Sequence, residues 1–146
     1  MELKVKLVRE GAQMPRYATP GAAAADLCAV CGAEGVTVPP LGRALIPTGV
    51  AIELPDAGYV ALVFARSGLG IKHGLTLSNG VGVIDSDYRG EISVGLVNLS
   101  AETYTVRSGE RIAQLAVVPV QQMQLVQTEV LSPTRRGAGG LGSTGR

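Results

Sequence analysis

The sequence predicts an all-β fold, a distorted jelly-roll β-sandwich or barrel with one short helical turn and a flexible Gly-rich C-terminal arm. Short apolar segments follow one another along the chain, and turn-forming residues separate them at close intervals. Twenty glycines and eight prolines in 146 residues favour many short strands over long helices. With four Tyr, one Phe and no Trp, the core must consist of Val, Leu, Ile and Ala.

The predicted strands alternate apolar and polar residues or form short apolar runs. They cover residues 3–8, 26–30, 36–38, 43–46, 49–54, 59–65, 92–98, 104–106, 112–118 and 123–130. The continuous apolar run at 59–65 is typical of a strand buried on both faces. Ser67 to Ile71 is the one predicted helical turn, with Ser67 as its N-cap. We expect one β domain over residues 1–132, followed by a Gly-rich arm, 133–146, that cannot stay ordered alone.

Charge and cysteine content limit the functional classes. The net charge is +1, so no strong field attracts nucleic acid or an anionic membrane. No apolar run reaches the roughly 18 residues of a transmembrane helix, and residues 1–7 alternate in polarity like a strand rather than a signal peptide. Cys28 and Cys31 form a single C-x-x-C, but zinc needs two more ligands and His73 is the only histidine. We therefore expect free thiols, a cytoplasmic location, and neither nucleic acid nor membrane as a partner.

The segment of residues 82–90 carries the most informative chemistry. Val83 and Ile84 favour a strand, and the Asp85 carboxylate follows at the point where that strand ends. Tyr88 comes next, and glycines at both ends of the segment permit close approach of the backbone to another group. The pattern predicts a tight β-hairpin that holds an acid and an aromatic ring against a ligand. The alternative is an ordinary hairpin with a solvated acidic tip.

A second segment, Arg66-Ser67-Gly68, has the features of a phosphate site. It follows the predicted buried strand and opens the predicted helical turn, whose free N–H groups and positive dipole end suit phosphate. Ser67 adds a hydroxyl donor, and Arg66 offers a planar fork for phosphate oxygens. The alternative is a capping serine beside a surface arginine. Asn79-Gly80 is a strong turn signal in its own right.

Taken together, these segments resemble the motifs of the trimeric dUTPases, which are dUTP pyrophosphatases. Five motifs occur in the family's order and extend from about Pro20 to the last residue, so the resemblance covers most of the chain. They are residues 20–27, 65–69, 77–80 together with 82–90, 109–114, and 136–145. Each motif alone is common, whereas five in order are specific.

The resemblance implies hydrolysis of dUTP to dUMP and pyrophosphate, with attack of water at the α-phosphorus. Asp85 would orient that water and act as general base. Mg²⁺ would bind mostly through substrate oxygens and waters, and Asp26 would hold those waters indirectly. The loop 66–68 would bind the α- and β-phosphates, and Gln114 would reach the outer phosphates. Judged from the strand pattern alone, Gln114 is an outward-facing polar residue.

The resemblance also implies a slot for uracil. Its residues would be Asn79, Gly82, Val83 and Ile84. Backbone groups that pair with uracil would be left unpaired by cytosine, and unpaired buried groups are costly. Tyr88 would lie against the deoxyribose and exclude a 2′-hydroxyl, and Ser93 would lie near the base.

In the family the C-terminal arm closes over the triphosphate, which excludes water from the site. The lid residues here would be Arg136, Leu141, Gly142, Ser143 and Thr144. Judged from composition alone, such a Gly-rich terminus is a disordered tail. Leu141 replaces the family's usual phenylalanine, which removes about 0.5–1.5 kcal/mol of ring stacking. Ala24 replaces the glycine that usually precedes Asp26 by two residues.

The family assembles as a homotrimer, with phosphate loops, hairpin and arm of each site supplied by different chains, and we expect the same here. Two other hypotheses stay open. A dCTP deaminase shares this fold but carries a glutamate soon after the hairpin, where this chain has Gly95; Glu91 comes too early. A non-catalytic trimeric β-sandwich would not need the set Arg66, Ser67, Asn79, Asp85, Tyr88, Gln114 and Arg136.

Overall fold

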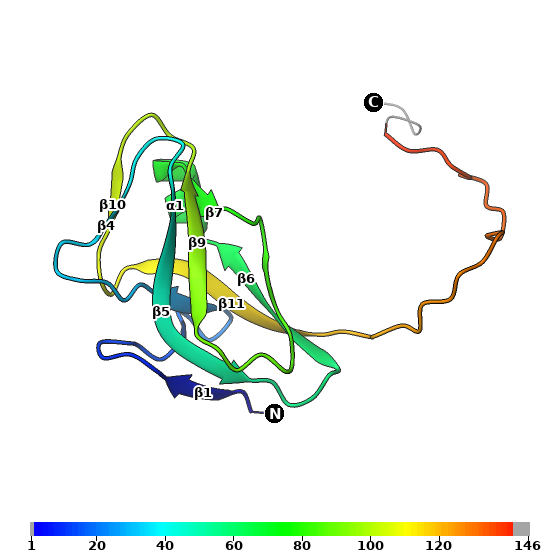
Figure 1. The fold of residues 1–146 in the computed structure, drawn as a ribbon, viewed down its shortest axis with the longest axis horizontal. Helices are drawn as coiled ribbons and strands as arrows, with labels where there is room; N and C mark the ends of the chain where they lie inside the picture. The colour runs from blue at the N-terminus through cyan, green and yellow to red at the C-terminus, as the bar shows by residue number, and fades with distance from the viewer. Residues whose placement is uncertain (1, 142–146) are drawn as a thin grey trace.

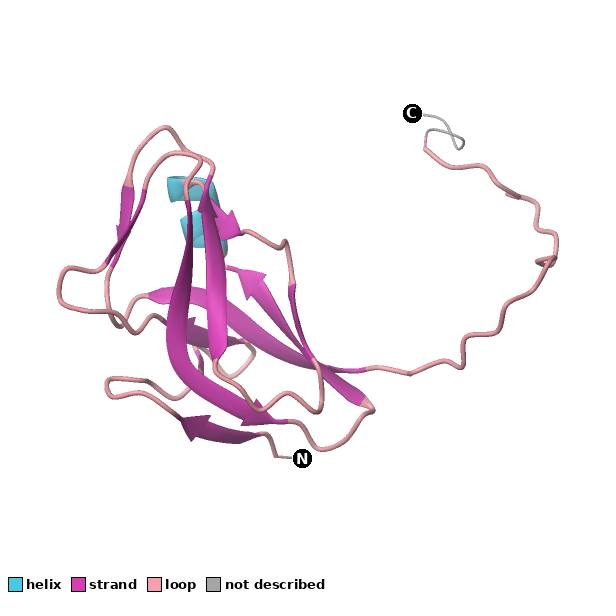
Figure 2. Ribbon diagram, viewed as in Figure 1, coloured by secondary structure: helices cyan, strands magenta, loops and turns pink. Residues whose placement is uncertain are grey.

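Two antiparallel sheets pack face to face and form a sandwich (Figure 1). The computed structural model describes residues 2–141. A four-stranded sheet has the order β1-β5-β9-β7, a five-stranded sheet has the order β2-β3-β11-β6-β8, and β10 and β4 form a separate pair. Within the described residues there is one helix, α1, and Figure 2 shows it among strands and loops. The predicted all-β, distorted jelly-roll class is confirmed.

The elements have the following bounds. They are β1 (Lys4–Leu7), β2 (Arg16–Tyr17), β3 (Ala25–Cys28), β4 (Val36–Val38), β5 (Arg43–Glu53), β6 (Tyr59–Ala65), α1 (Ser67–His73), β7 (Leu75–Leu77), β8 (Gly82–Ile84), β9 (Ile92–Asn98), β10 (Tyr104–Val106) and β11 (Arg111–Pro119). Between residues 2 and 141, no helix is long and apolar enough to cross a membrane.

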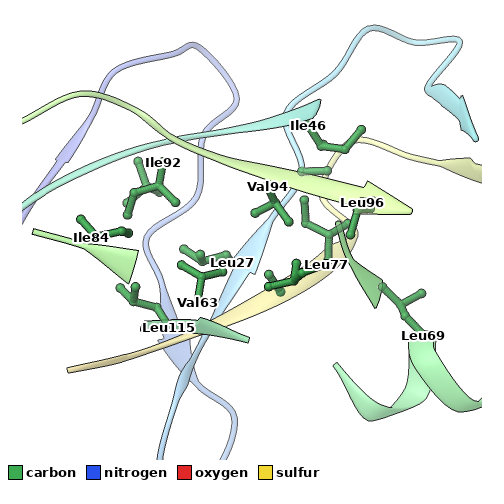
Figure 3. Close-up of a cluster of buried hydrophobic side chains, with 14 of the residues drawn as sticks. Leu27, Ile46, Val63, Leu69, Leu77, Ile84, Ile92, Val94, Leu96 and Leu115 are labelled. Atoms are coloured by element: carbon green, nitrogen blue, oxygen red, sulfur yellow. The ribbon is translucent and has the colours of Figure 1, made fainter. Parts of the chain in front are cut away.

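The core lies between the two large sheets and is aliphatic, as the composition requires. Every second residue of β9 is buried, which is the period of a strand with one face on the core. Figure 3 shows Leu27 and Val63 of the five-stranded sheet across the core from Val94 of β9. Burying each such side chain contributes about 1.5–3 kcal/mol, so this cluster holds the sheets in register.

Strand β6 has the predicted bounds but not the predicted burial on both faces. Ala61 and Val63 are buried, whereas their neighbours on the opposite face are half-buried. In the single chain, one face of β6 therefore packs on the core and the other is partly open to solvent.

The residues from Arg43 to Glu53 form one strand, although Pro47-Thr48 was expected to separate two. The strand survives because a β-bulge absorbs the irregularity: its pairing with β9 shifts register between Pro47 and Val50. The buried Thr48 hydroxyl donates a hydrogen bond of 2.6 Å to the carbonyl of Ile92. Gly49 adopts a φ of 68°, a conformation that glycine accepts without strain.

The helix α1 forms where predicted, but Ser67 is not its N-cap. Arg66 occupies that position in an extended conformation, and no side chain caps the helix there. Ser67 is already the first helical residue, and the helix continues to His73 before Gly74 ends it with a φ of 69°. The short strands β2 (two residues) and β7 (three residues) were not predicted.

The predicted strand at 123–130 does not form. From Gln121 to Leu141 the chain has no strand or helix and extends away from the sandwich (Figure 1). Leu125 is 94% exposed. The segment has strand-like composition, but a strand needs a partner edge, and within the described chain none lies beside it.

The predicted hairpin at 82–90 is also wrong, and its replacement creates the site. β8 pairs with β6 in the five-stranded sheet, whereas β9 pairs with β5 and β7 in the four-stranded sheet. The link between β8 and β9 therefore crosses from one sheet to the other. The turn from β7 to β8 crosses in the opposite direction, with Gly80 at a φ of 75°.

Candidate active site

A cavity of about 250 Å³ opens between β8, β9 and the two connections that cross the sheets. It gathers seven of the residues that the sequence singled out. These are Asn79, Gly82, Val83, Ile84, Asp85, Tyr88 and Ser93. Val63, Leu77, Ile92 and Val94 supply an apolar floor from the core. The residues expected to contact the base and the sugar thus share one pocket with the Asp85 carboxylate, although they do not form a hairpin.

Two glycines that line the cavity, Gly82 and Gly95, pack too closely on their neighbours to carry a side chain without a shift. A Cβ at Gly82 would lie 3.1 Å from Cβ of Val63, so the backbone of β8 packs closely on β6. A Cβ at Gly95 would lie 2.5 Å from the hydroxyl of Ser78. Any side chain at position 95, such as the glutamate expected of a deaminase, would therefore displace the Ser78 hydroxyl.

Asp85 directly follows the last residue of β8 and is exposed. Its backbone carbonyl accepts a hydrogen bond of 3.2 Å from the N–H of Tyr88, which closes a turn at the cavity rim. Among the hydrogen bonds and ion pairs of residues 2–141, none involves the Asp85 carboxylate. Both carboxylate oxygens are thus available to water or to a ligand.

Tyr88 is held in a defined position on the same link. Its hydroxyl donates a hydrogen bond of 3.0 Å to the carbonyl of Glu91. A Cβ at Gly90 would lie only 2.4 Å from that hydroxyl oxygen, so only glycine lets the ring fold back over the chain. Tyr88 is 46% exposed and borders the cavity.

A second polar cluster surrounds Asp26. One carboxylate oxygen accepts from Nε of Arg66 at 2.8 Å, and the other accepts from Nη1 of Arg111 at 3.1 Å. The Asp26 side chain is only 12% exposed, so both ion pairs are partly shielded from solvent. Gln114 donates a hydrogen bond of 2.9 Å to the carbonyl of Ala65, beside Arg66. This cluster joins the first, second and fourth motifs.

The Asp26 cluster limits how a metal ion could bind. Within the described part of the chain, no group of three or more His, Cys, Asp or Glu side chains comes together. Both oxygens of Asp26 already face arginines, so direct coordination would compete with two guanidinium groups. The cluster is compatible with a hydrated Mg²⁺ that takes its ligands from phosphate and water, because such an ion needs no direct bond to Asp26.

In the single chain the two clusters do not share a cavity. Arg66, Ser67, Gly68 and Gln114 do not line the pocket that holds Asp85, and Ser67 and Gly68 are exposed at the start of α1. In the arm, Arg136 donates a hydrogen bond of 2.8 Å to the nearby carbonyl of Gly139, and Leu141 is fully exposed. The predicted lid residues Gly142, Ser143 and Thr144 lie outside the described residues.

Two charged residues of the site were missed by the sequence reasoning. Arg111 lies inside the fourth motif, and its position opposite Cys28 on the neighbouring strand brings it to Asp26. Glu91 lines the cavity and was considered only as a deaminase residue.

Cys28 and Cys31 are free thiols, and burial raises the pKa of Cys28.

The two sheets enclose a pocket where the chain crosses between them, and this pocket is lined by a carboxylate without a hydrogen-bond partner and by an anchored tyrosine. Such a site indicates an all-β enzyme that acts on a small molecule. The family model described as dUTPase matches residues 10–145. The chain therefore belongs to the dUTPase family.

Individual relatives agree with this assignment. The chain is 51% identical to the deoxyuridine 5'-triphosphate nucleotidohydrolase of Desulfitobacterium hafniense, over 99% of this chain and 97% of that protein. It is 50% identical to the protein of the same name from Hydrogenobaculum sp., over 99% of each.

Solved structures show the same likeness. The dUTPase of Staphylococcus bacteriophage 80alpha with dUPNHPP superposes with a TM-score of 0.89 at 31% identity, covering 99% of both chains. A mutant dUTPase from phage phi11 of S. aureus, described for its coordination of a structural Mg(II) ion, gives a TM-score of 0.81 at 28% identity. That match covers 91% of this chain and 100% of the other.

Proposed function

We propose that this protein hydrolyses dUTP to dUMP and pyrophosphate. The observation that carries the proposal is the single cavity that brings Asp85, Tyr88 and the backbone of β8 together. The names of the relatives, and the dUPNHPP bound to the bacteriophage 80alpha enzyme, support the same substrate.

The uracil ring would lie against β8. This strand is at the edge of its sheet, so one row of its N–H and C=O groups has no strand partner. Those groups can pair with the donor and acceptor pattern of uracil, and cytosine presents the reverse pattern at the same edge. Asn79 and Ser93 border the same space and would complete the contact with the base. Discrimination arises because a mismatched base leaves buried polar groups unpaired.

The sugar would lie against the ring of Tyr88, which two contacts hold in place. With the hydroxyl bonded to Glu91 and the ring packed over Gly90, the ring has little freedom to retreat. A 2′-hydroxyl on the ribose face would meet this rigid surface, so we expect UTP to be a poor substrate.

Asp85 would accept a proton from a water molecule aimed at the α-phosphorus. The new bond forms between that water oxygen and the α-phosphorus as the bond to the bridging oxygen breaks, and pyrophosphate departs. Arg66, Ser67 and Gly68 would hold the α- and β-phosphates, and Gln114 the outer ones. Mg²⁺ bound to the phosphates would neutralise developing charge. Asp26 would orient Arg66 and the waters of the ion.

We further propose a homotrimer with shared sites in the cytoplasm. The cavity lined by Asp85 and Tyr88, here called the nucleoside cavity, lies apart from the Asp26 cluster and from the arm within one chain. A triphosphate site needs all three. The arm extends away from the sandwich of its own chain (Figure 1), as expected of a segment that serves another subunit. The two free thiols favour a reducing compartment.

One assay tests the activity and its alternatives. Pyrophosphate release is measured with dUTP, dCTP, dTTP and UTP, and ammonia release is measured in parallel. We expect pyrophosphate from dUTP alone, loss of that activity with EDTA, and recovery when Mg²⁺ is added in excess. Ammonia from dCTP would identify a deaminase, and no turnover of any nucleotide would leave a non-catalytic sandwich.

A further inference from the structure

Glu91 lines the nucleoside cavity, yet the proposed chemistry gives it no role. Its side chain is only 18% exposed, and a partly buried carboxylate is retained only where other groups compensate its charge. The groups that compensate it indicate what this residue does.

The Glu91 carboxylate connects three segments of the chain. Its Oε1 accepts from Nε of Arg9 at 2.6 Å and from the backbone N–H of Gly49 at 2.8 Å. Arg9 follows β1, and Gly49 lies in the bulge of β5. The hydrogen bond from Arg9 lowers the pKa of Glu91, so the carboxylate is ionised at neutral pH. Charge-assisted bonds of this kind are about twice as strong as neutral ones.

The backbone of Glu91 connects to the sugar side of the cavity. Its carbonyl accepts the Tyr88 hydroxyl at 3.0 Å, and the preceding Gly90 lies directly under the Tyr88 ring. Any shift of Glu91 therefore moves the anchor of that ring. The carbonyl of the next residue, Ile92, accepts the buried Thr48 hydroxyl, so Glu91 lies where the link joins the fixed start of β9.

We propose that Glu91 is a positioning residue for Tyr88, and that the Arg9–Glu91–Gly49 contacts set how closely the tyrosine ring approaches the sugar. This rests on the proposed function, in which Tyr88 selects deoxyribose over ribose. Glu91 acts through Tyr88 and not on the reacting atoms. Its loss should therefore alter sugar selectivity more than the rate with the preferred substrate.

A role limited to stabilising the β5 bulge is the rival explanation. It predicts a lower melting temperature and an unchanged preference between dUTP and UTP. The test compares Glu91→Ala and Glu91→Gln with Glu53→Ala as matched control. Glu53 also pairs with a cation, Lys4 of β1, at 2.7 Å, but it does not line the nucleoside cavity and makes no hydrogen bond to the Tyr88 link among the described residues. Glu91→Gln keeps an acceptor for Gly49 and serves if the alanine variant does not fold.

Two readouts are measured. The first is the ratio of kcat/KM for dUTP to that for UTP, which we expect Glu91→Ala to lower by about tenfold, because small displacements of a positioning group cost about this much or more. The second is the ring resonances of Tyr88 by NMR without substrate, assigned with Tyr88→Phe. We expect them to shift in Glu91→Ala, to shift less in Glu91→Gln, and to stay in place in Glu53→Ala.

An unchanged substrate ratio in active Glu91→Ala enzyme overturns the inference, whatever the melting temperature. A wild-type protein that does not turn over dUTP overturns the proposed function instead. In that case the ring resonances still decide the positioning role: a shift in Glu91→Ala supports it and no shift overturns it.

Discussion

Asp85 is a residue whose expected effects on turnover and on stability can be separated. Its carboxylate is exposed at the cavity rim, and the described chain gives it no bonding partner, so its removal leaves no buried group unsatisfied. We expect Asp85→Asn to keep the melting temperature and to lower kcat by about 10²–10⁴-fold, the usual contribution of a general base. Steady-state pyrophosphate release and calorimetry on the same preparation measure both.

Asp87→Asn is the matched control, because Asp87 is an exposed acid on the same link and does not line the cavity. It should retain wild-type kcat. Near-normal turnover by Asp85→Asn would contradict the assignment of Asp85 as the base.

At the scale of elements, the turn between β10 and β11 is held by a bond that depends on pH. The Tyr104 hydroxyl donates to the Glu110 carboxylate, which also accepts from the N–H of Arg107 at 3.0 Å. Burial and the neighbouring carboxylate raise the pKa of Tyr104 to about 12 from 10.0. A raised pKa contributes stability that is fully present below pH 10 and is lost as pH rises through 12. We expect unfolding free energy, measured with urea, to fall across that window.

Tyr104→Phe removes the titrating group and should flatten this alkaline decline while lowering stability at neutral pH. Tyr17→Phe, at a residue 64% exposed, serves as the control and should leave the decline unchanged. An equally steep decline in Tyr104→Phe would show that other groups cause it.

At the scale of the whole molecule, the separation of the cavity from the arm has a direct test. Deleting residues 136–146 should lower turnover strongly with little change in melting temperature, because Arg136 to Leu141 make no contact with the core. Asp85→Asn should be inactive for a different reason. If sites are shared between chains, unfolding the two variants together and refolding them gives mixed trimers. Some sites then combine an intact Asp85 with an intact arm.

We therefore expect the mixture to recover measurable dUTP hydrolysis that neither variant shows alone. Sedimentation of the wild type should give the mass of a trimer. A monomer, or a mixture without activity, would contradict shared sites.

Local pattern predicted much of this structure. Residues 59–65, 92–98 and 104–106 form strands with the predicted bounds, because apolar runs between turn signals define them. Local pattern also singled out Asp85 and Tyr88 in the segment 82–90, whereas the residues of the base slot and Ser93 followed from the resemblance to the dUTPases. What failed depended on distant partners. The link at 82–90 was assigned to a hairpin because local pattern does not show which sheet a strand joins. Likewise, the Arg9–Glu91 pair spans 82 positions and leaves no local signal.

Because residues 85–91 cross between the two sheets, the geometry of the site depends on how the sheets are placed relative to each other. The wall that would accept the base belongs to one layer, and the floor beyond Ile92 belongs to the other. In the proposed mechanism, slippage of one layer over the other would pull Asp85 and Tyr88 out of alignment with β8 before the aliphatic core came apart. On gentle heating, activity should therefore be lost at a lower temperature than the folded structure.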